Sequence, residues 1–170
     1  IELRHIKMDL VSPFVTSMGT EYDEQHIMVR VDAEGVTGWG ESVAEGTPFY
    51  SYETVTTAWH ILNDFLIPSI LGKDISSIDE AIASYAKVRG HMMAKAGLEA
   101  ALWDAFAKSK NMSLSKMFGG VRSKVDVGVS IGIQSSEKEL IHKVEGYLSE
   151  GYKRIKIKNI FITKGLFDQL

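Results

Sequence analysis

Residues 125–158 read VDVGVSIGIQSSEKELIHKVEGYLSEGYKRIKIK and contain two strand patterns on either side of a helix pattern. Residues 125–131 and 152–158 are predicted strands. Between them, Ser136 and Glu139 match the S-x-x-E capping box that begins a helix, and Gly151 can end that helix. A strand, a helix and a strand so close together predict a βαβ unit, in which the two strands are parallel and the crossover is right-handed.

The second predicted strand ends in Lys156-Ile157-Lys158. Because side chains alternate across a strand, both lysines share one face. A solvated edge face is the simpler interpretation, since exposed lysines are common. A parallel sheet, however, is usually covered on both faces, and a covered lysine is costly unless it is paired or functional. Burial and a neighbouring ammonium both favour the neutral amine that a general base needs, so the pair is a catalytic candidate.

The region before this unit has the pattern of an antiparallel meander followed by helices. The predicted strands are residues 5–11, 26–31 and 36–43, and the first strand is expected to end at Pro13. Residues 13–24 are turn-rich and are expected to form a mobile loop. Helical spacing predicts helices at about 55–66, 77–88 and 91–108, the first of them limited by Pro68. Gly119-Gly120 marks the change to the βαβ pattern.

The chain has 170 residues, of which 45% are hydrophobic and 24% charged, and its formal net charge is −3. This composition excludes a disordered chain and indicates no basic field for nucleic acid. Because the sequence has no cysteine, disulfides, zinc–thiolate sites and a thiol nucleophile are excluded. No apolar run is long enough for a membrane span. We therefore expect a cytoplasmic globular protein with neither a nucleic-acid nor a membrane partner.

The remaining polar residues give weaker signals. Ser130 ends the first strand of the βαβ unit, where its hydroxyl can touch a substrate or be only a structural hydrogen-bonding group. His91 opens a helix and is expected to cap it or to pack. We interpret the glycines around Trp39 as hairpin geometry, with Trp39 as a core or interface anchor. The acidic residues form no metal-ligand cluster by spacing; they include Glu41, Glu45, Glu99, Asp104 and Asp126.

A set of short stretches keeps its order along residues 1–158. It comprises LVSPF at 10–14, GWGE at 38–41, PFY at 48–50, LIP at 66–68, GHMMAK at 90–95, LE at 98–99, GVSIG at 128–132 and GYKRIKIK at 151–158. This set resembles the N-acylamino acid racemase and o-succinylbenzoate synthase group of the enolase superfamily. The resemblance implies an α+β fold, with a capping domain over 1–118 and the first βαβ unit of an incomplete (β/α) barrel over 119–158.

The resemblance also implies roles for individual residues. Lys158 would be a general acid/base at the α-carbon of the substrate, and Lys156 would support it. The residues implied to lie at the substrate are Phe14, Met18, Tyr50 and Ser130. The substrate would be a small-molecule carboxylate, and the protein a possible homo-oligomer.

The implied chemistry is proton abstraction next to a carboxylate, with the enediolate stabilised by a divalent metal, expected to be magnesium. In the synthase, a lyase, loss of water yields o-succinylbenzoate for menaquinone synthesis. In the racemase, an isomerase and the alternative here, a lysine on the opposite face returns the proton. The family's metal-binding acids and this second lysine lie on later barrel strands, so no metal ligand is assigned in this chain. We favour the synthase because it is the common biosynthetic role in this group.

Residues 159–170 depart from the group. Where its members have a Pro-Gly segment, this chain has Asn159-Ile160-Phe161-Ile162. We interpret 159–170 as a divergent tail, as a frameshift or early stop would produce, and we expect the chain alone to be an inactive fragment. An alternative of another class is a non-catalytic remnant or interaction module, whose exposed strand edge binds another chain.

Overall fold

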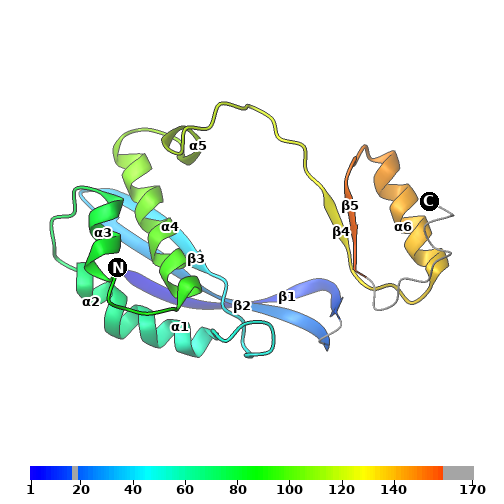
Figure 1. Ribbon diagram of the computed structural model, residues 1–170, viewed down its shortest axis with the longest axis horizontal. Coiled ribbons are helices and arrows are strands. Elements are labelled where there is room, and N and C mark those ends of the chain that lie inside the picture. The colour runs from blue at the N-terminus through cyan, green and yellow to red at the C-terminus, as the bar shows by residue number, and fades with distance from the viewer. Residues whose placement is uncertain (17–18, 159–170) are drawn as a thin grey trace. The chain divides into compact units, whose positions relative to one another are not determined.

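The computed structural model describes residues 1–16 and 19–158 (Figure 1). The chain forms two compact units. Unit 1 comprises Ile1–Asp9 and Asp23–Val121, and unit 2 comprises Leu10–Tyr22 and Arg122–Leu170. Unit 1 holds an antiparallel sheet with helices, and unit 2 holds a two-stranded parallel sheet, so the predicted α+β fold class is confirmed. The predicted domain boundaries stay predictions, and the proposed tail at 159–170 lies outside the described residues.

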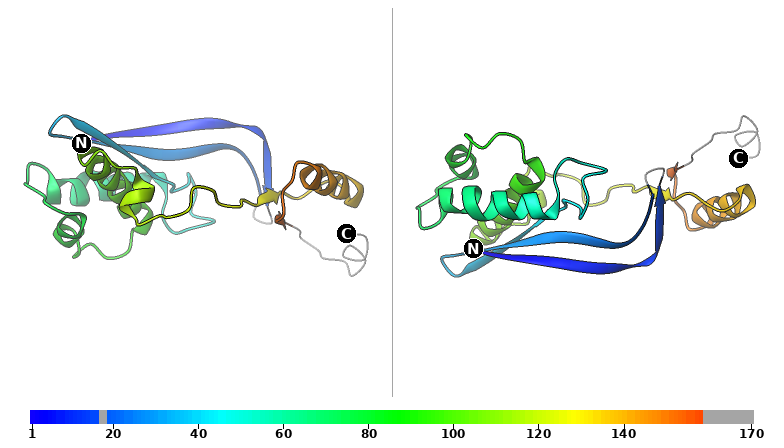
Figure 2. Two further views of the ribbon diagram at one scale, coloured as in Figure 1. Left: turned by 90° about the horizontal axis from the view of Figure 1, so that it is seen from above. Right: turned by 90° about the horizontal axis from the view of Figure 1, so that it is seen from below.

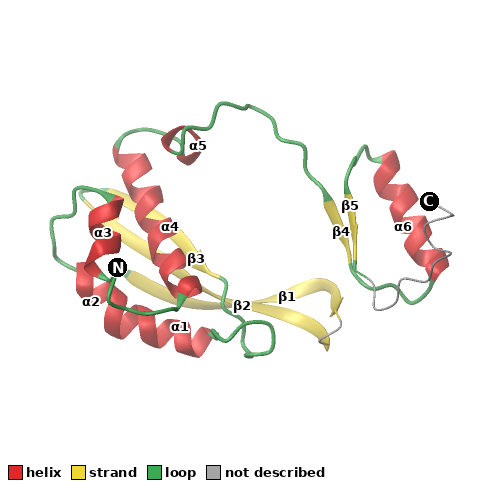
Figure 3. Cartoon of the chain, viewed as in Figure 1, coloured by secondary structure: helices red, strands yellow, loops and turns green. Residues whose placement is uncertain are grey.

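The antiparallel sheet has the order β1-β2-β3, with β1 at Glu2–Thr16, β2 at Gly19–Ala33 and β3 at Val36–Ser42 (Figure 3). Two expectations are therefore wrong, because β1 continues through Pro13 and most of the expected loop at 13–24 is strand. β1 is an edge strand, and an edge strand accommodates a proline whose nitrogen faces the unpaired side.

The helices of unit 1 cover one face of this sheet (Figure 2). They are α1 (Val55–Ile61), the π-helix η1 (Leu62–Leu66), α2 (Ile67–Ile70), α3 (Ile78–Ser84) and α4 (Met92–Ser109). The short helix α5 (Leu114–Met117) follows α4 and contains no buried residue. The expectation that Pro68 limits the first helix is wrong, since helical backbone continues to Ile70. Pro68 lies in the first turn of α2, where a residue without an N–H is tolerated. No described helix has the length and apolar character needed to cross a membrane.

Glycines let α4 lie directly against β3. A methyl group at Gly40 would overlap the Gly97 carbonyl oxygen, and one at Gly38 would overlap the Ala101 carbonyl oxygen. A methyl group at Gly97 would in turn meet the backbone of Ser42. Gly38 and Gly40 are thus close-approach positions rather than hairpin residues, which corrects their sequence interpretation. The turn itself uses Gly35, whose φ is +81°.

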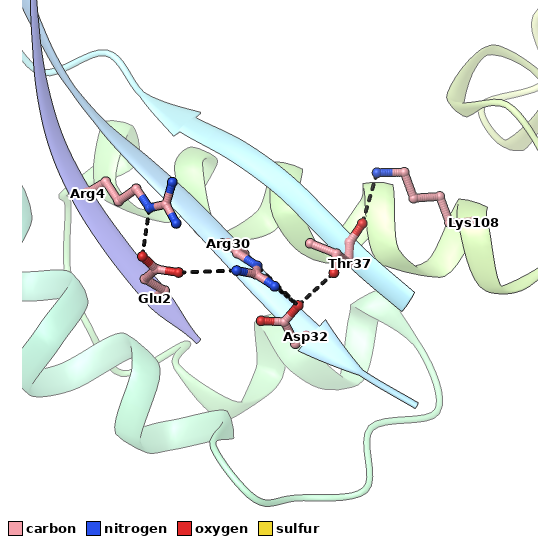
Figure 4. Close-up of polar contacts among 6 residues, drawn as sticks. All are labelled: Glu2, Arg4, Arg30, Asp32, Thr37 and Lys108. Carbon is pink, nitrogen blue, oxygen red and sulfur yellow. Dashed lines mark hydrogen bonds and ion pairs between the residues drawn. The ribbon is translucent and has the colours of Figure 1, made fainter. Parts of the chain in front are cut away.

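Polar and charged side chains connect the three strands at the end of the sheet where β2 turns into β3 (Figure 4). Asp32 Oδ1 accepts hydrogen bonds from Thr37 Oγ1 at 2.6 Å and from Arg30 Nη2 at 2.9 Å. The Thr37 hydrogen bond is the main cause that lowers the pKa of Asp32. Glu2 pairs with Arg4 at 2.6 Å and with Arg30 at 3.4 Å, so this network links β1, β2 and β3.

Asp104 connects α4 to the edge strand β3 through a hydrogen bond. Its Oδ2 accepts hydrogen bonds from Trp39 N at 2.9 Å and from Lys108 Nζ at 2.6 Å, and Lys108 also donates to the Thr37 carbonyl oxygen. Burial raises the pKa of Asp104, but the Lys108 and Trp39 hydrogen bonds outweigh burial and lower the pKa overall. Trp39 was expected to be a core or interface anchor. It is 39% exposed and its ring lies 5.6 Å from the Arg4 guanidinium, so it is not a core residue.

The N-terminus of α4 is capped from a distant loop. Its N-cap residue, His91, has a φ of +53° and makes no side-chain capping bond. Its ring lies edge-on to the Tyr52 ring with 6.5 Å between the centroids, so of the two expected roles the structure shows packing and not capping. Glu53, only 2% exposed, accepts hydrogen bonds from Met93 N at 2.9 Å and from Ala94 N at 3.1 Å. A carboxylate at this position satisfies two unpaired N–H groups and faces the positive end of the helix dipole.

We expect Glu53→Gln to lower the free energy of unfolding of unit 1 by about 2 kcal/mol. The amide keeps the size of the side chain but has one acceptor oxygen for two helix N–H groups, and it carries no charge. Denaturant unfolding followed by tryptophan fluorescence measures this change, because Trp39, Trp59 and Trp103 all lie in unit 1. The matched control is Glu41→Gln, an exposed site on β3. Equal stability of the two variants would contradict the capping role of Glu53.

Unit 2 contains the predicted βαβ unit, with β4 at Val129–Ile131, α6 at Glu137–Ser149 and β5 at Ile155–Ile157. β4 and β5 are parallel, as predicted, although both strands are shorter than expected. Ser136 Oγ accepts a hydrogen bond from Glu139 N at 3.3 Å, as the capping pattern predicts. The Glu139 carboxylate, however, accepts from Ser135 Oγ at 2.6 Å, so the second bond of the box goes to the preceding serine.

Candidate active site

The two faces of the β4–β5 sheet differ in chemistry. One face is apolar, where Ile131, Ile155 and Ile157 pack with Leu140 and Val144 of α6. α6 is the only helix in the described part of unit 2, and it packs on this face. α6 covers the isoleucine face, whereas Ser130 and Lys156 on the other face are exposed, so in the described residues that face is covered only in part.

The other face carries the polar residues that the sequence singled out. Ser130 is the register partner of Lys156, so a hydroxyl and an ammonium lie side by side on adjacent parallel strands. Both side chains are exposed. Lys158 N donates to the Ile131 carbonyl oxygen at 2.9 Å, which extends the ladder beyond β5 and returns Lys158 to the face of Lys156. The structure thus brings together Ser130, Lys156 and Lys158.

Phe14 of β1 belongs to the same unit and contacts this group. Lys158 Nζ lies 3.8 Å from the centroid of the Phe14 ring, well within the range of a cation–π interaction. Both side chains are half-buried. The sequence suggested each residue separately, through the resemblance, but no local pattern signals a contact between positions so far apart in the chain.

The other two suggested substrate residues are not joined to this group. Tyr50 lies in unit 1, in the segment before α1, and its side chain is 76% exposed. The base of that segment is fixed by a hydrogen bond of 2.8 Å from Val55 N to the Glu45 carbonyl oxygen and by the Glu53 cap on α4. Met18 lies outside the described residues. The roles suggested for Tyr50 and Met18 stay predictions.

Residues 1–16 and 19–158 contain no group of three or more His, Cys, Asp or Glu side chains placed to hold a metal ion. The described side chains of the candidate site are two amines, a hydroxyl and an aromatic ring. Amines can exchange protons and bind anions, and the ring offers an apolar and cation-binding surface.

Comparison with known proteins places the chain in a family. Residues 1–119 match the N-terminal domain of the mandelate racemase / muconate lactonizing enzyme family. The chain belongs to this family. The chain is 47% identical over 157 residues to the o-succinylbenzoate synthase of Geobacillus stearothermophilus, and the match covers 92% of the chain but 42% of that relative. It is 41% identical over 157 residues to the N-succinylamino acid racemase of Thermus thermophilus, with the same coverage.

Solved structures give the same result for the fold. A member of the enolase superfamily from Listeria innocua superposes with a TM-score of 0.85 at 35% identity, over 93% of this chain and 44% of that one. The resemblance to the racemase and synthase group of the enolase superfamily is therefore confirmed. The chain spans less than half the length of these relatives.

Proposed function

We propose that this chain is the capping domain and first βαβ unit of an enzyme that removes a proton next to a carboxylate, with Lys158 as the general base. The observation that carries the proposal is the shared face of Lys156, Lys158 and Ser130. This face lies at the carboxyl ends of two parallel strands, where the active sites of α/β barrels lie.

Each of the three residues has a separate task in the proposal. The neutral amine of Lys158 accepts the α-proton of the substrate at Nζ and holds it as an ammonium. Lys156 and Ser130 supply an ammonium and a hydroxyl on the same face, and such groups bind a carboxylate. The substrate is accordingly a small-molecule carboxylate.

A divalent metal, magnesium in the group that the sequence resembles, would supply a Lewis acid to stabilise the enediolate. The carboxylates and histidines of the described residues do not fit such a site, and none of them is assigned to a metal.

Formation of o-succinylbenzoate is the favoured activity. Synthases of three bacilli are 43–47% identical to this chain, which supports this assignment. The alternative is racemisation of N-succinylamino acids, because racemases of Thermus thermophilus and Amycolatopsis are 41% and 40% identical. Both activities would use Lys158, so this part of the enzyme supports either. A cytoplasmic location remains part of the proposal.

A chimera tests the proposal. Residues 1–158 would replace the matched region of the G. stearothermophilus synthase, which supplies the rest of the barrel. We expect the chimera to form o-succinylbenzoate, and the unfused chain to show no turnover even with excess magnesium. Racemisation without synthase turnover would favour the alternative activity. A folded chimera with neither activity, beside an active parent synthase, would contradict the proposed function.

A further inference from the structure

We infer that Phe14 is a positioning residue for Lys158, because its ring contacts the lysine amino group and fixes the direction of that side chain. The contact itself rests on the geometry of unit 2, and its consequence for catalysis rests on the proposed function of Lys158. In this role the ring contacts the base, whereas the resemblance implied that Phe14 contacts the substrate.

The two lysines of the candidate face differ in their surroundings. Lys156 is exposed, whereas Lys158 is half-buried and its Nζ lies 3.8 Å from the centroid of the Phe14 ring. A lysine side chain has four rotatable bonds, and an isolated lysine at a strand end samples many rotamers. A ring in contact with the amino group restricts this freedom and favours one rotamer of Lys158, whereas the exposed Lys156 makes no such contact with a ring of the described residues.

The backbone beside Phe14 is close to the βαβ unit as well. The carbonyl oxygen of Val15 lies 3.8 Å from the position that a Cβ of Gly132 would take, just after β4. The segment that carries the ring therefore meets both the β4 end of the sheet and the lysine that follows β5. Phe14 is also near Thr16, the residue at which β1 ends.

Lysine labelled with ¹³C at Cε tests the contact directly in the full chain. Protons above the face of an aromatic ring resonate upfield, so we expect the Hε signal of Lys158 upfield of the Lys156 signal. Loss of a signal in Lys158→Arg and in Lys156→Arg assigns the two resonances. In Phe14→Leu, the Lys158 signal should move to the position of the Lys156 signal. In Phe14→Tyr, which restores a ring, it should remain upfield.

The matched control is Val11→Ala, because Val11 lies on the same strand and is fully exposed. Its Lys158 signal should be unchanged, and the other lysine signals should be unchanged in every variant, which shows that the fold is kept. An Hε signal of Lys158 that is not upfield in the natural sequence, or that stays upfield in Phe14→Leu, would overturn the inference. These readouts need no turnover, so they remain decisive if the proposed function fails.

The chimera separates positioning from substrate contact. If Phe14 orders the base, Phe14→Leu should lower kcat several-fold with little change in KM, and Phe14→Tyr should restore kcat. A rise in KM at unchanged kcat would instead assign Phe14 to the substrate wall and overturn the positioning role.

Discussion

Replacing Lys158 by alanine in the chimera is expected to lower kcat/KM by about 10³- to 10⁴-fold. The α-proton of a carboxylate is very weakly acidic, so its removal depends on a base held at the reacting carbon. Lys156 lies on the same face but earlier along the strand, beside Ser130, so its amine cannot replace that of Lys158 at the reacting carbon. We expect Lys156→Ala to have a smaller effect, mainly through weaker binding of the carboxylate.

The measurement is a steady-state assay of the chimera and its variants with magnesium in excess. Lys138→Ala serves as the matched control, because Lys138 is an exposed lysine on α6 of the same unit. Circular dichroism establishes that each variant is folded. A Lys158→Ala variant that keeps more than a tenth of the activity would mean that the base is another residue.

Gly40→Ala is expected to destabilise unit 1 by more than about 4 kcal/mol, so that much of the chain is unfolded. The added methyl group would meet the carbonyl oxygen of Gly97 and the amide nitrogen of Ala101. These are backbone atoms of α4, so no flexible side chain can move aside to make room. The helix would have to leave the sheet, which would also separate Asp104 from its Trp39 hydrogen bond.

Denaturant unfolding followed by tryptophan fluorescence checks this expectation, since the three tryptophans report on unit 1. The matched control is Gly146→Ala in α6, where a Cβ meets no atom within 4 Å. It should leave the tryptophan transition unchanged, and helix propensity should stabilise α6 slightly. A Gly40→Ala variant as stable as this control would contradict the close packing of α4 on β3.

The candidate site was predictable where it depends on strand geometry. The alternation of side chains placed Lys156 and Lys158 on one face, and the βαβ pattern predicted the parallel pairing that brings Ser130 beside Lys156. The lengths of the strands and of the first helical segment were not predictable in this way. Pro13 and Pro68 are breakers by local rule, but β1 is an edge strand and Pro68 lies in the first turn of α2.

The sequence alone therefore determined the order of the five strands and of the longer helices, and the shared face of the two lysines, because hydrophobic periodicity and side-chain alternation are local properties of the chain. The tertiary structure alone decided that Glu53 caps α4, that Gly40 lets α4 pack directly on β3, and that Phe14 lies against Lys158. Each of these contacts joins residues far apart in the sequence. Their distance is set by how the elements pack, and no pattern within a short segment records it.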